Sequence, residues 1–512
     1  MLTKSRYLKF LQCPRYLWLW EHQKEEMQKP LSLSDEWTIE EGKHVEEIAR
    51  LLFPTGKHVK SFHEAGAKHT REYMDAGAVC LFQATAIGDD LLAMADILQF
   101  DPKLKVWDIY EVKSTTQVKE EHLHDVTFQR LAFERAGYKI GKTFLIHINK
   151  EYVLGKKLDP SGLLTVEDVT DDAREIEDDV SGNITQAQAL LVCPTEPTPK
   201  ELPCGCSPKD CPCPEHCFPG LPEHSVYYLR GITAKKAKVL YESGTRVIDE
   251  VPDNTKLTEA QQLQVLSAKR GEPIIDHAAI RKTLDSLTYP LYFFDYETFS
   301  NTVPVFEGFK PGQVMPFQYS LHVQRAPGGE FEHFEYLAPA FVNTIPGIVA
   351  ALRDHIGEQG SVIVWNKSFE MGCNDDMGAL YPADAPFLRA VNERIFDLME
   401  IFSHLHYIDA KFNGSFSIKK VLPVLVPVLS HKDLDISEGM TASLSWYRMF
   451  APEKTQQERG QTKKNLLEYC KLDTFAMVEI FRFLQGLERD GVDRSATITL
   501  TPKKEPKGLP LG

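Results

Sequence analysis

The sequence lacks any uninterrupted apolar run near the roughly 20 residues that a membrane-spanning helix needs. Its first segment, MLTKSRYLKFLQCPRYLW, also lacks the continuous apolar core and the small-residue cleavage site of a signal peptide. The sequence therefore lacks the usual signatures of membrane proteins and of secreted proteins. We therefore expect a cytoplasmic protein.

An excess of positive charge is missing too. The 512 residues hold 58 Lys and Arg against 73 Asp and Glu, which gives a net charge of −15. This balance argues against a protein that coats nucleic acid nonspecifically, although an enzyme with a local basic groove is still compatible with it. The sequence shows no solenoid-type repeat, and its length predicts two or three domains rather than one core.

Compositional breaks predict where these domains begin and end. Residues 1–223 mix helical patterns with strand-like runs and finish in a segment rich in Pro and Cys. Residues 224–288 have a helical pattern, and strands alternate with helices over 289–488. Residues 489–512 have the composition of a disordered tail. We expect a multidomain α/β (α+β) protein.

Two carboxylates end an apolar strand pattern in the last large segment. In YFFDYETF, alternation places Asp295 and Glu297 on one face, where like charges repel unless a cation lies between them. A second strand pattern, VIVWNKSFE, carries Asn366 and Glu370 near its end. A single DYE on a strand is most often part of a solvated edge or a salt bridge, so a metal site needs further ligands elsewhere in the segment.

A later helical pattern, LLEYCKLDTFAMVEIF, supplies the missing partners. Tyr469 and Asp473 are four residues apart and therefore share a helix face. Four acidic side chains with a tyrosine one turn before the last are typical of a two-metal phosphodiester cleavage site. Oxygen ligands favour Mg²⁺ or Mn²⁺, with the Tyr469 hydroxyl orienting the attacking water. Asp397, in RIFDLMEIF, is a reserve ligand or substrate contact.

These motifs, in this order, resemble the tyrosine-bearing branch of the DEDD exonuclease superfamily, the DnaQ-like 3′-5′ exonucleases on an RNase H-like fold. The resemblance implies that Asp295, Glu297, Glu370 and Asp473 bind metal and that Asn366 contacts substrate. One departure stands out, because the second motif usually ends in Asp where this chain has Glu370.

A different acidic pattern lies upstream. AMADILQF places Asp96 on one strand, and WDIYEVK places Glu111 and Lys113 on the next. Asp and Glu can hold a divalent metal, while Lys positions the nucleophilic water or neutralises charge that builds on a phosphate. EVK alone is common in ordinary strands.

This D…E-x-K arrangement resembles the PD-(D/E)xK nucleases, whose fold is restriction-endonuclease-like, and in particular their RecB-type branch. That branch implies a metal-binding histidine on a preceding helix, here His44, and a Gln-x-x-x-Tyr helix that contacts substrate, here beginning at Gln129. Phe133 stands where the tyrosine is usual.

Cysteines complete the resemblance. Cys13 lies near the start, and Cys206, Cys211 and Cys217 follow the predicted nuclease core, as in RecB-type nucleases whose [4Fe–4S] cluster fastens the chain ends together. Zinc is the competing interpretation. Cys204 and Cys213 are surplus in this scheme. The other four cysteines are expected to be core or incidental thiols: Cys80, Cys193, Cys373 and Cys470.

Between the two patterns, LRGITAKKAKVLYESGTRVIDEVP resembles a helix-hairpin-helix element, which presents backbone N–H groups to a phosphate. The whole chain before the tail resembles an uncharacterised bacterial family that fuses a RecB-like nuclease to a DnaQ-like exonuclease. The resemblance implies a metal-dependent nuclease with two nuclease centres, acting on single-stranded DNA or DNA ends in repair, recombination or defence. Two alternatives stay open: an RNA exonuclease with only the C-terminal site active, and a non-catalytic nucleic-acid-binding adaptor.

Overall fold

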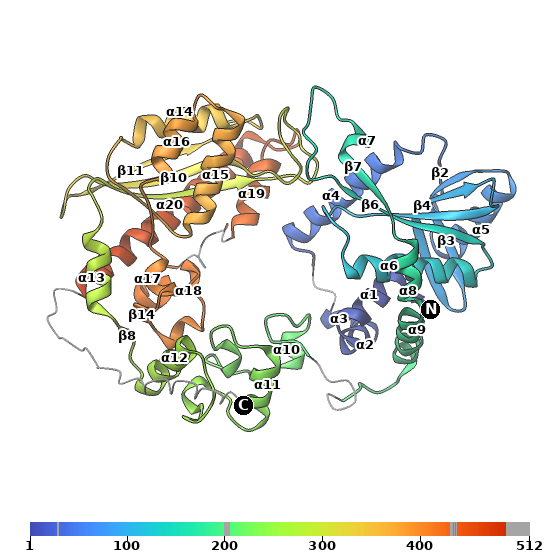
Figure 1. Cartoon of the computed structure of the whole chain (residues 1–512), viewed down its shortest axis with the longest axis horizontal. Coiled ribbons are helices and arrows are strands. Elements are labelled where there is room, and N and C mark those ends of the chain that lie inside the picture. Colours follow the sequence, from blue (N-terminus) through green and yellow to red (C-terminus); the bar gives the residue numbers. More distant parts are fainter. Residues whose placement is uncertain (28–29, 199–204, 431–433, 435, 437, 488–512) are drawn as a thin grey trace, which may run out of the picture.

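The computed structural model describes residues 1–27, 30–198, 205–430, 434, 436 and 438–487. It is a mixed α/β structure with a seven-stranded sheet, a five-stranded sheet and a two-stranded ribbon, which confirms the coarse fold class. Figure 1 shows the first large sheet, in blue to teal, on one side of the molecule and the second, in yellow to orange, on the other. Within these described ranges, no helix is long and apolar enough to cross a membrane.

The first sheet has the order β2-β3-β4-β5-β6-β7, with β1 paired to β4. Its strands are β1 (Leu2–Thr3), β2 (Lys57–His58), β3 (Cys80–Gly88), β4 (Leu91–Asp101), β5 (Val106–Val112), β6 (Ile140–Ile148) and β7 (Leu164–Asp168). β3, β4 and β5 form an antiparallel meander, whereas β5 and β6 run parallel. A parallel pair needs a crossover, and α6 (Glu120–Arg135) supplies it.

The other helices of this first part pack on the sheet or on one another. They are α1 (Lys4–Gln12), α2 (Pro14–His22), α3 (Lys24–Met27), α4 (Leu33–Arg50), α5 (His63–Asp75), α7 (Pro160–Leu163), α8 (Thr170–Glu175), α9 (Glu177–Val192) and α10 (Pro214–Cys217). Helix α6 is buried along most of its length, including Phe128 and Phe133. Phe133 therefore belongs to the core.

The second sheet has the order β11-β10-β9-β12-β13. Its strands are β9 (Leu291–Phe299), β10 (Met315–Gln324), β11 (Phe331–Leu337), β12 (Ser361–Val364) and β13 (Ile395–Asp397). The first three pair antiparallel, and β12 pairs parallel to both β9 and β13. β10 is buried at every position, as expected for a strand covered on both faces.

Long helix α20 (Gln456–Gly486) covers one face of this sheet, against β9 and β10. It begins at a capping box in which the Thr455 hydroxyl accepts from the Glu458 N–H and the Glu458 carboxylate accepts from the Thr455 N–H. The other helices of this part are α14 (Ile345–His355), α15 (Lys367–Leu380), α16 (Ala385–Asn392), α17 (Glu400–Ser403), α18 (Ile418–Leu425) and α19 (Gly439–Arg448), with a 3₁₀ turn η3 (Ala410–Phe412).

The intervening segment contains short helical elements: η1 (Val226–Tyr228), α11 (Ala234–Glu242), η2 (Ile248–Glu250), α12 (Glu259–Arg270) and α13 (His277–Asp285). Strand β8 (Ile274–Ile275) pairs with β14 (Tyr407–Ile408), which fastens this segment to the second half. The expected pair of helices in LRGITAKKAKVLYESGTRVIDEVP is one α-helix followed by a 3₁₀ turn. Gly244 ends α11 with φ of 101°, which a residue with a side chain rarely adopts.

Helix α4 joins the two large sheets. Its last turns bury Val45, Ile48 and Ala49 in a core with residues of the first sheet, and Val303 of the second half packs into that same core. In Figure 1, α4 lies between the first sheet and helix α19, against which it packs. A second junction is made of two backbone hydrogen bonds, from the Leu154 N–H to the Phe309 carbonyl and from the Gly308 N–H to the Leu154 carbonyl.

The domain boundaries expected from composition stay a prediction. The tail over 489–512 and Cys204 lie outside the described residues.

Candidate metal centres

A cavity of about 500 Å³ opens beside β9 and α20. Asp295, Glu297, Tyr469 and Asp473 all line it. β9 contributes the first two from one strand face, and α20 contributes the last two from one helix face. Four of the predicted site residues, from two segments far apart in the sequence, therefore share one cavity.

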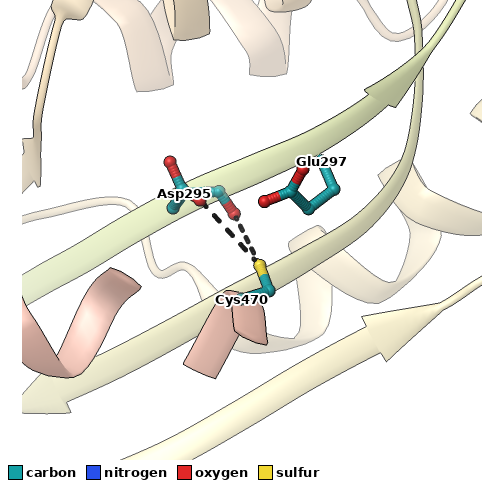
Figure 2. A group of neighbouring side chains, drawn as sticks. All are labelled: Asp295, Glu297 and Cys470. Atoms are coloured by element: carbon teal, nitrogen blue, oxygen red, sulfur yellow. Dashed lines mark hydrogen bonds between the residues drawn. The ribbon is translucent and has the colours of Figure 1, made fainter. Parts of the chain in front are cut away.

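Cys470 joins this group unexpectedly. Its Sγ lies 3.9 Å from Asp295 Oδ2 and 3.9 Å from the Asp295 carbonyl oxygen. One ligand atom each from Asp295, Glu297 and Cys470 lie within 4.8 Å of one another, and Figure 2 shows the three side chains turned toward a common point. Cys470 was expected to be a core or incidental thiol; it is fully buried, and its sulfur also faces the carboxylates.

Burial and crowded negative charge disfavour ionisation here. The pKa of Asp295 lies well above its ordinary value because of burial first and then the charges of Asp473, Glu297 and Glu370. Burial and Asp473 raise the pKa of Glu297 as well, while Lys419 opposes the rise. A bound cation would relieve this repulsion.

Glu370 closes the group from a helix. It lies in the first turn of α15, one turn beyond β12, so its predicted place on a strand end is corrected to a helix start. Burial, and next the charge of Asp397, raises its pKa to about 8, opposed by a backbone hydrogen bond. Its Oε2 is buried and has no hydrogen-bond partner among the described residues. An unpartnered carboxylate oxygen beside other acids fits a metal ligand.

Tyr469 and Lys419 complete the cavity wall. Burial, followed by the charges of Asp473, Glu297 and Asp295, raises the pKa of the buried Tyr469 hydroxyl. Tyr469 is therefore a neutral phenol next to the carboxylates, able to hold a water by hydrogen bonding. The Lys419 ammonium lies 5.7 Å from the Tyr469 ring centroid and brings positive charge to the cavity.

Asp397 has a structural role, and its predicted role as a reserve ligand or substrate contact stays a prediction. Its carboxylate accepts from three backbone N–H groups, those of Asn366 at 3.1 Å, Lys367 at 3.0 Å and Met399 at 3.0 Å. It thus caps the first turn of α15 and fixes the helix that carries Glu370. Asn366 is exposed with φ of 107° at the N-cap of α15. Its predicted substrate contact stays a prediction.

The upstream acids also meet. Asp96 on β4 and Glu111 on β5 are one position beyond the opposed pair Ile97 and Tyr110. Asp96 Oδ2 accepts from the Val112 N–H at 2.9 Å. Burial and the charge of Glu111 raise the pKa of Asp96. The two strands therefore bring both predicted ligands to one place.

Two lysines form hydrogen-bonded ion pairs with Glu111. Lys113 Nζ and Lys4 Nζ each donate to Glu111 Oε1 at 2.8 Å. Burial disfavours the Glu111 carboxylate, but the charges of Lys113 and Lys4 outweigh burial and lower its pKa. Although 29% of the Lys4 side chain is exposed, its ammonium also lies 3.5 Å from Asp125 Oδ2.

Gln129 is an internal clamp. Its amide donates to Glu111 Oε2 at 2.7 Å and to Asp125 Oδ1 at 3.0 Å, and the side chain is fully buried. Lys113 also donates to Asp125. The predicted substrate contact of Gln129 is therefore corrected: a residue without exposed surface positions the carboxylates instead.

Helix α4 brings a different residue to this centre than the sequence predicted. His44 is exposed, whereas Glu46 accepts from the Gln83 amide at 2.5 Å. The same amide donates to Asp96 Oδ1 at 3.1 Å. Glu46 thus stands near Asp96, whereas His44 is exposed and its predicted metal ligation stays a prediction.

Thiols from both ends of the first part lie together. Cys13, Cys211 and Cys213 are buried, and the charges of Cys217, Cys211 and Cys13, after burial itself, raise the pKa of Cys213 to about 12. Burial and the charge of Cys211 likewise raise the pKa of Cys217 to about 12. Cys206 packs against this cysteine group and is disulfide-bonded. Cys213 therefore lies within the group, although the predicted ligand set leaves it out.

A salt-bridged arginine fastens the two chain segments around these cysteines. Arg15 Nε lies 2.5 Å from Glu196 Oε1, which His216 Nε2 also meets at 2.8 Å. The Trp18 indole N–H donates to the Cys193 carbonyl at 2.9 Å. With or without a metal, the N-terminal helices are held to the cysteine-rich segment.

The sequence analysis missed several residues of these two sites. Asp125 could have been found, since it stands four residues before Gln129 on the same helix. Lys4 could not, because 107 residues separate it from Glu111. Lys419 is likewise one lysine among many until the fold places it in the cavity.

Part of the second half matches a known family. Residues 292–417 match the model of a domain of unknown function, DUF2779. The matched segment holds Asp295, Glu297 and Glu370 and ends before Tyr469.

Two relatives are uncharacterized proteins of Mycoplasma. The MG366 homolog of Mycoplasma pneumoniae is 28% identical over 211 residues, covering 38% of this chain and 32% of the relative. MG366 of Mycoplasma genitalium is 26% identical over 224 residues, covering 40% and 34%. The chain thus spans about a third of the length of these relatives.

Proposed function

We propose that this protein is a divalent-metal-dependent nuclease that hydrolyses phosphodiester bonds of DNA. The main support is the cavity in which Asp295, Glu297 and Asp473 meet Tyr469, with the unpartnered Oε2 of Glu370 nearby. Crowding acids in a core is costly unless a cation balances their charge.

The donor set fits Mg²⁺ or Mn²⁺, which prefer oxygen ligands. When bound, such ions would polarise the scissile phosphate and lower the pKa of a bound water. The chain's own part is to hold the ligands on β9, α15 and α20, to orient water with Tyr469, and to counter phosphate charge with Lys419.

Topology supports an RNase H-like assignment of the second half. Three antiparallel strands followed by two parallel ones, with acids on the first strand and on a covering helix, agree with a DEDD exonuclease. The assignment rests on this agreement and on the motif order, with Glu370 in place of the usual Asp.

A second centre in the first half is part of the proposal. Asp96 and Glu111, with Lys113, occupy adjacent strands of a mixed sheet followed by a crossover helix, an arrangement compatible with a PD-(D/E)xK nuclease. Lys113 would position water, and Gln129 would hold Glu111 in place.

The cysteine group fits a structural [4Fe–4S] cluster. Buried thiols with raised pKa values are poor as free acids and good as ligands once a metal displaces their protons. We assign ligation to Cys13, Cys206, Cys211 and Cys217. Cys213 is the alternative to Cys206, whose disulfide would first have to be reduced. Zinc is the competing ion.

Two substitutions in the full chain test the proposal. Asp295→Ala and Lys113→Ala proteins are incubated with labelled single-stranded DNA, duplex DNA and RNA, with Mg²⁺ or Mn²⁺. Each substitution should lower the cleavage activity of its own centre by about 100-fold or more. Even residues that only support a metal site change activity by about 10- to 100-fold. If wild-type protein leaves all substrates intact, or binds them without carboxylate-dependent cleavage, an adaptor role replaces the nuclease.

A second candidate has only the C-terminal centre active, on RNA. An inactive N-terminal centre is favoured by the hydrogen bonds that Glu111 already makes within the protein, since its two oxygens accept from Lys4, Lys113 and Gln129. In that case Asp295→Ala alone removes all cleavage, and Lys113→Ala changes nothing.

A further inference from the structure

Residues of the first half reach into the cavity of the second. Ser34, Trp37, Thr38 and Glu41 of α4 line the same cavity as Asp295. Their spacing of three, one and three residues puts them on one face of the helix. Part of the wall of this cavity is thus built by α4.

This wall is fixed in place. The Glu41 carboxylate accepts from the Thr302 N–H at 2.5 Å and from its hydroxyl at 2.9 Å. Arg448 of α19 pairs with Glu36 at 3.1 Å and Glu40 at 3.2 Å. With its later turns buried in the other core, α4 is held from both sides.

Trp37 provides an aromatic ring in this wall, held by contacts with other rings. Its ring lies 5.1 Å from the Tyr447 ring and 6.2 Å from the Phe299 ring, both of the second half. The side chain is half-buried and lines the cavity. Nearby, the cavity-lining Phe369 and Met440 are 38% and 52% exposed.

We propose that α4 completes the C-terminal site and that Trp37 stacks on the terminal base of an unpaired nucleic-acid strand. The inference deepens the proposed nuclease function of that site and rests on it. A cavity of about 500 Å³ accepts one ligand-sized group rather than a duplex. Apolar rings for a base, with Lys419 for a phosphate, match the chemistry of a strand end. The first half is then a specificity element of the second.

Binding is measured by fluorescence anisotropy of a labelled single-stranded oligonucleotide. The full chain is used in an Asp295→Asn background, so that cleavage does not interfere. Trp37→Ala should weaken binding by about 5- to 150-fold, the range of one base–aromatic stack, whereas Trp37→Phe should restore most of it. Ile39→Ala is the matched control, since Ile39 is exposed on α4 outside the cavity wall.

Thr38→Trp is a second test of the cavity wall, for the case that Trp37→Ala disturbs folding. Thr38 is exposed, so a larger side chain there leaves the core intact but narrows the cavity and should weaken binding. Equal affinities of the Trp37→Ala, Thr38→Trp and Ile39→Ala proteins would overturn the inference, as would tighter binding of blunt duplex than of single strands. The two failures are distinguishable: full cleavage by the Asp295→Asn protein would defeat the proposed function, whereas equal affinities without cleavage would overturn only the role of α4.

Discussion

Glu370 is the predicted metal ligand that departs from the usual motif, both in residue type and in its place on a helix. The motif usually has an aspartate, yet this glutamate starts from a helix turn rather than a strand end, and its charge is felt by Asp295 of β9. Asp397 makes this possible by capping α15. The departure is therefore compatible with ligation.

The titration of Glu370 gives a first test. Its pKa rises from an ordinary 4.5 to about 8 on folding, so between these values the folded chain holds a proton that the unfolded chain has released. The stabilisation is present at low pH and is lost as pH rises toward 8, and a tenfold change in proton affinity corresponds to about 1.4 kcal/mol of unfolding free energy. The melting temperature of metal-free protein should fall more steeply with pH than that of Glu370→Gln.

Parallel pH profiles for the two proteins would contradict the raised pKa. Added Mn²⁺ should stabilise wild-type protein more at about pH 8 than at about pH 6, because ligation requires the ionised carboxylate.

Lys4 gives a second test. Lys4→Ala removes one of the two ammonium groups on Glu111 Oε1 and leaves more uncompensated charge with Glu111 and Asp125. We expect a loss of about 1–3 kcal/mol, seen as a lower melting temperature. Lys24→Ala is the control: Lys24 is 53% exposed and 4.0 Å from Glu21, so its loss should stay within about 0.5 kcal/mol. Equal melting temperatures would show that Lys4 is dispensable.

Among the helices and strands, α4 is the element that serves two cores. Glu41→Ala deprives the N–H and hydroxyl of Thr302 of their shared acceptor, and we expect about 1–3 kcal/mol of lost stability in thermal unfolding. Glu47→Ala, on an exposed position of the same helix, should be nearly neutral. A neutral Glu41→Ala would mean that α4 is held by its apolar contacts alone.

Local pattern predicted the elements that carry the acids, because alternation and helical spacing are properties of short segments. β9 ends at Phe299 with Asp295 and Glu297 on one face, and Tyr469 and Asp473 share a turn-to-turn face of α20. The predictions that failed concerned residues whose role depends on elements far away in the sequence. Whether Gln129 meets solvent or core, and whether His44 or Glu46 turns inward, depends on which surfaces neighbouring elements cover.

At the scale of the whole molecule, the proposed iron–sulfur cluster can be tested without a substrate. Anaerobically purified protein should contain iron and show broad visible absorption, and Cys211→Ser should lose both together with thermal stability. Cys80→Ser is the matched control, because Cys80 lies in a different core. Colourless wild-type protein with bound zinc would select the competing ion, and protein with neither metal would leave the thiols as packing residues.

Helix α1 links the cysteine group to the upstream acids. It begins at Lys4, whose ammonium contacts Glu111, and Cys13 caps its other end, so nine helical residues and about 14 Å join the thiols to those acids. A rigid rod of that length transmits displacement. If the protein is the proposed nuclease, oxidative damage to the cysteines is expected to displace Lys4 at these acids, so that two samples of the same chain would differ in cleavage because of the oxygen that they met during purification.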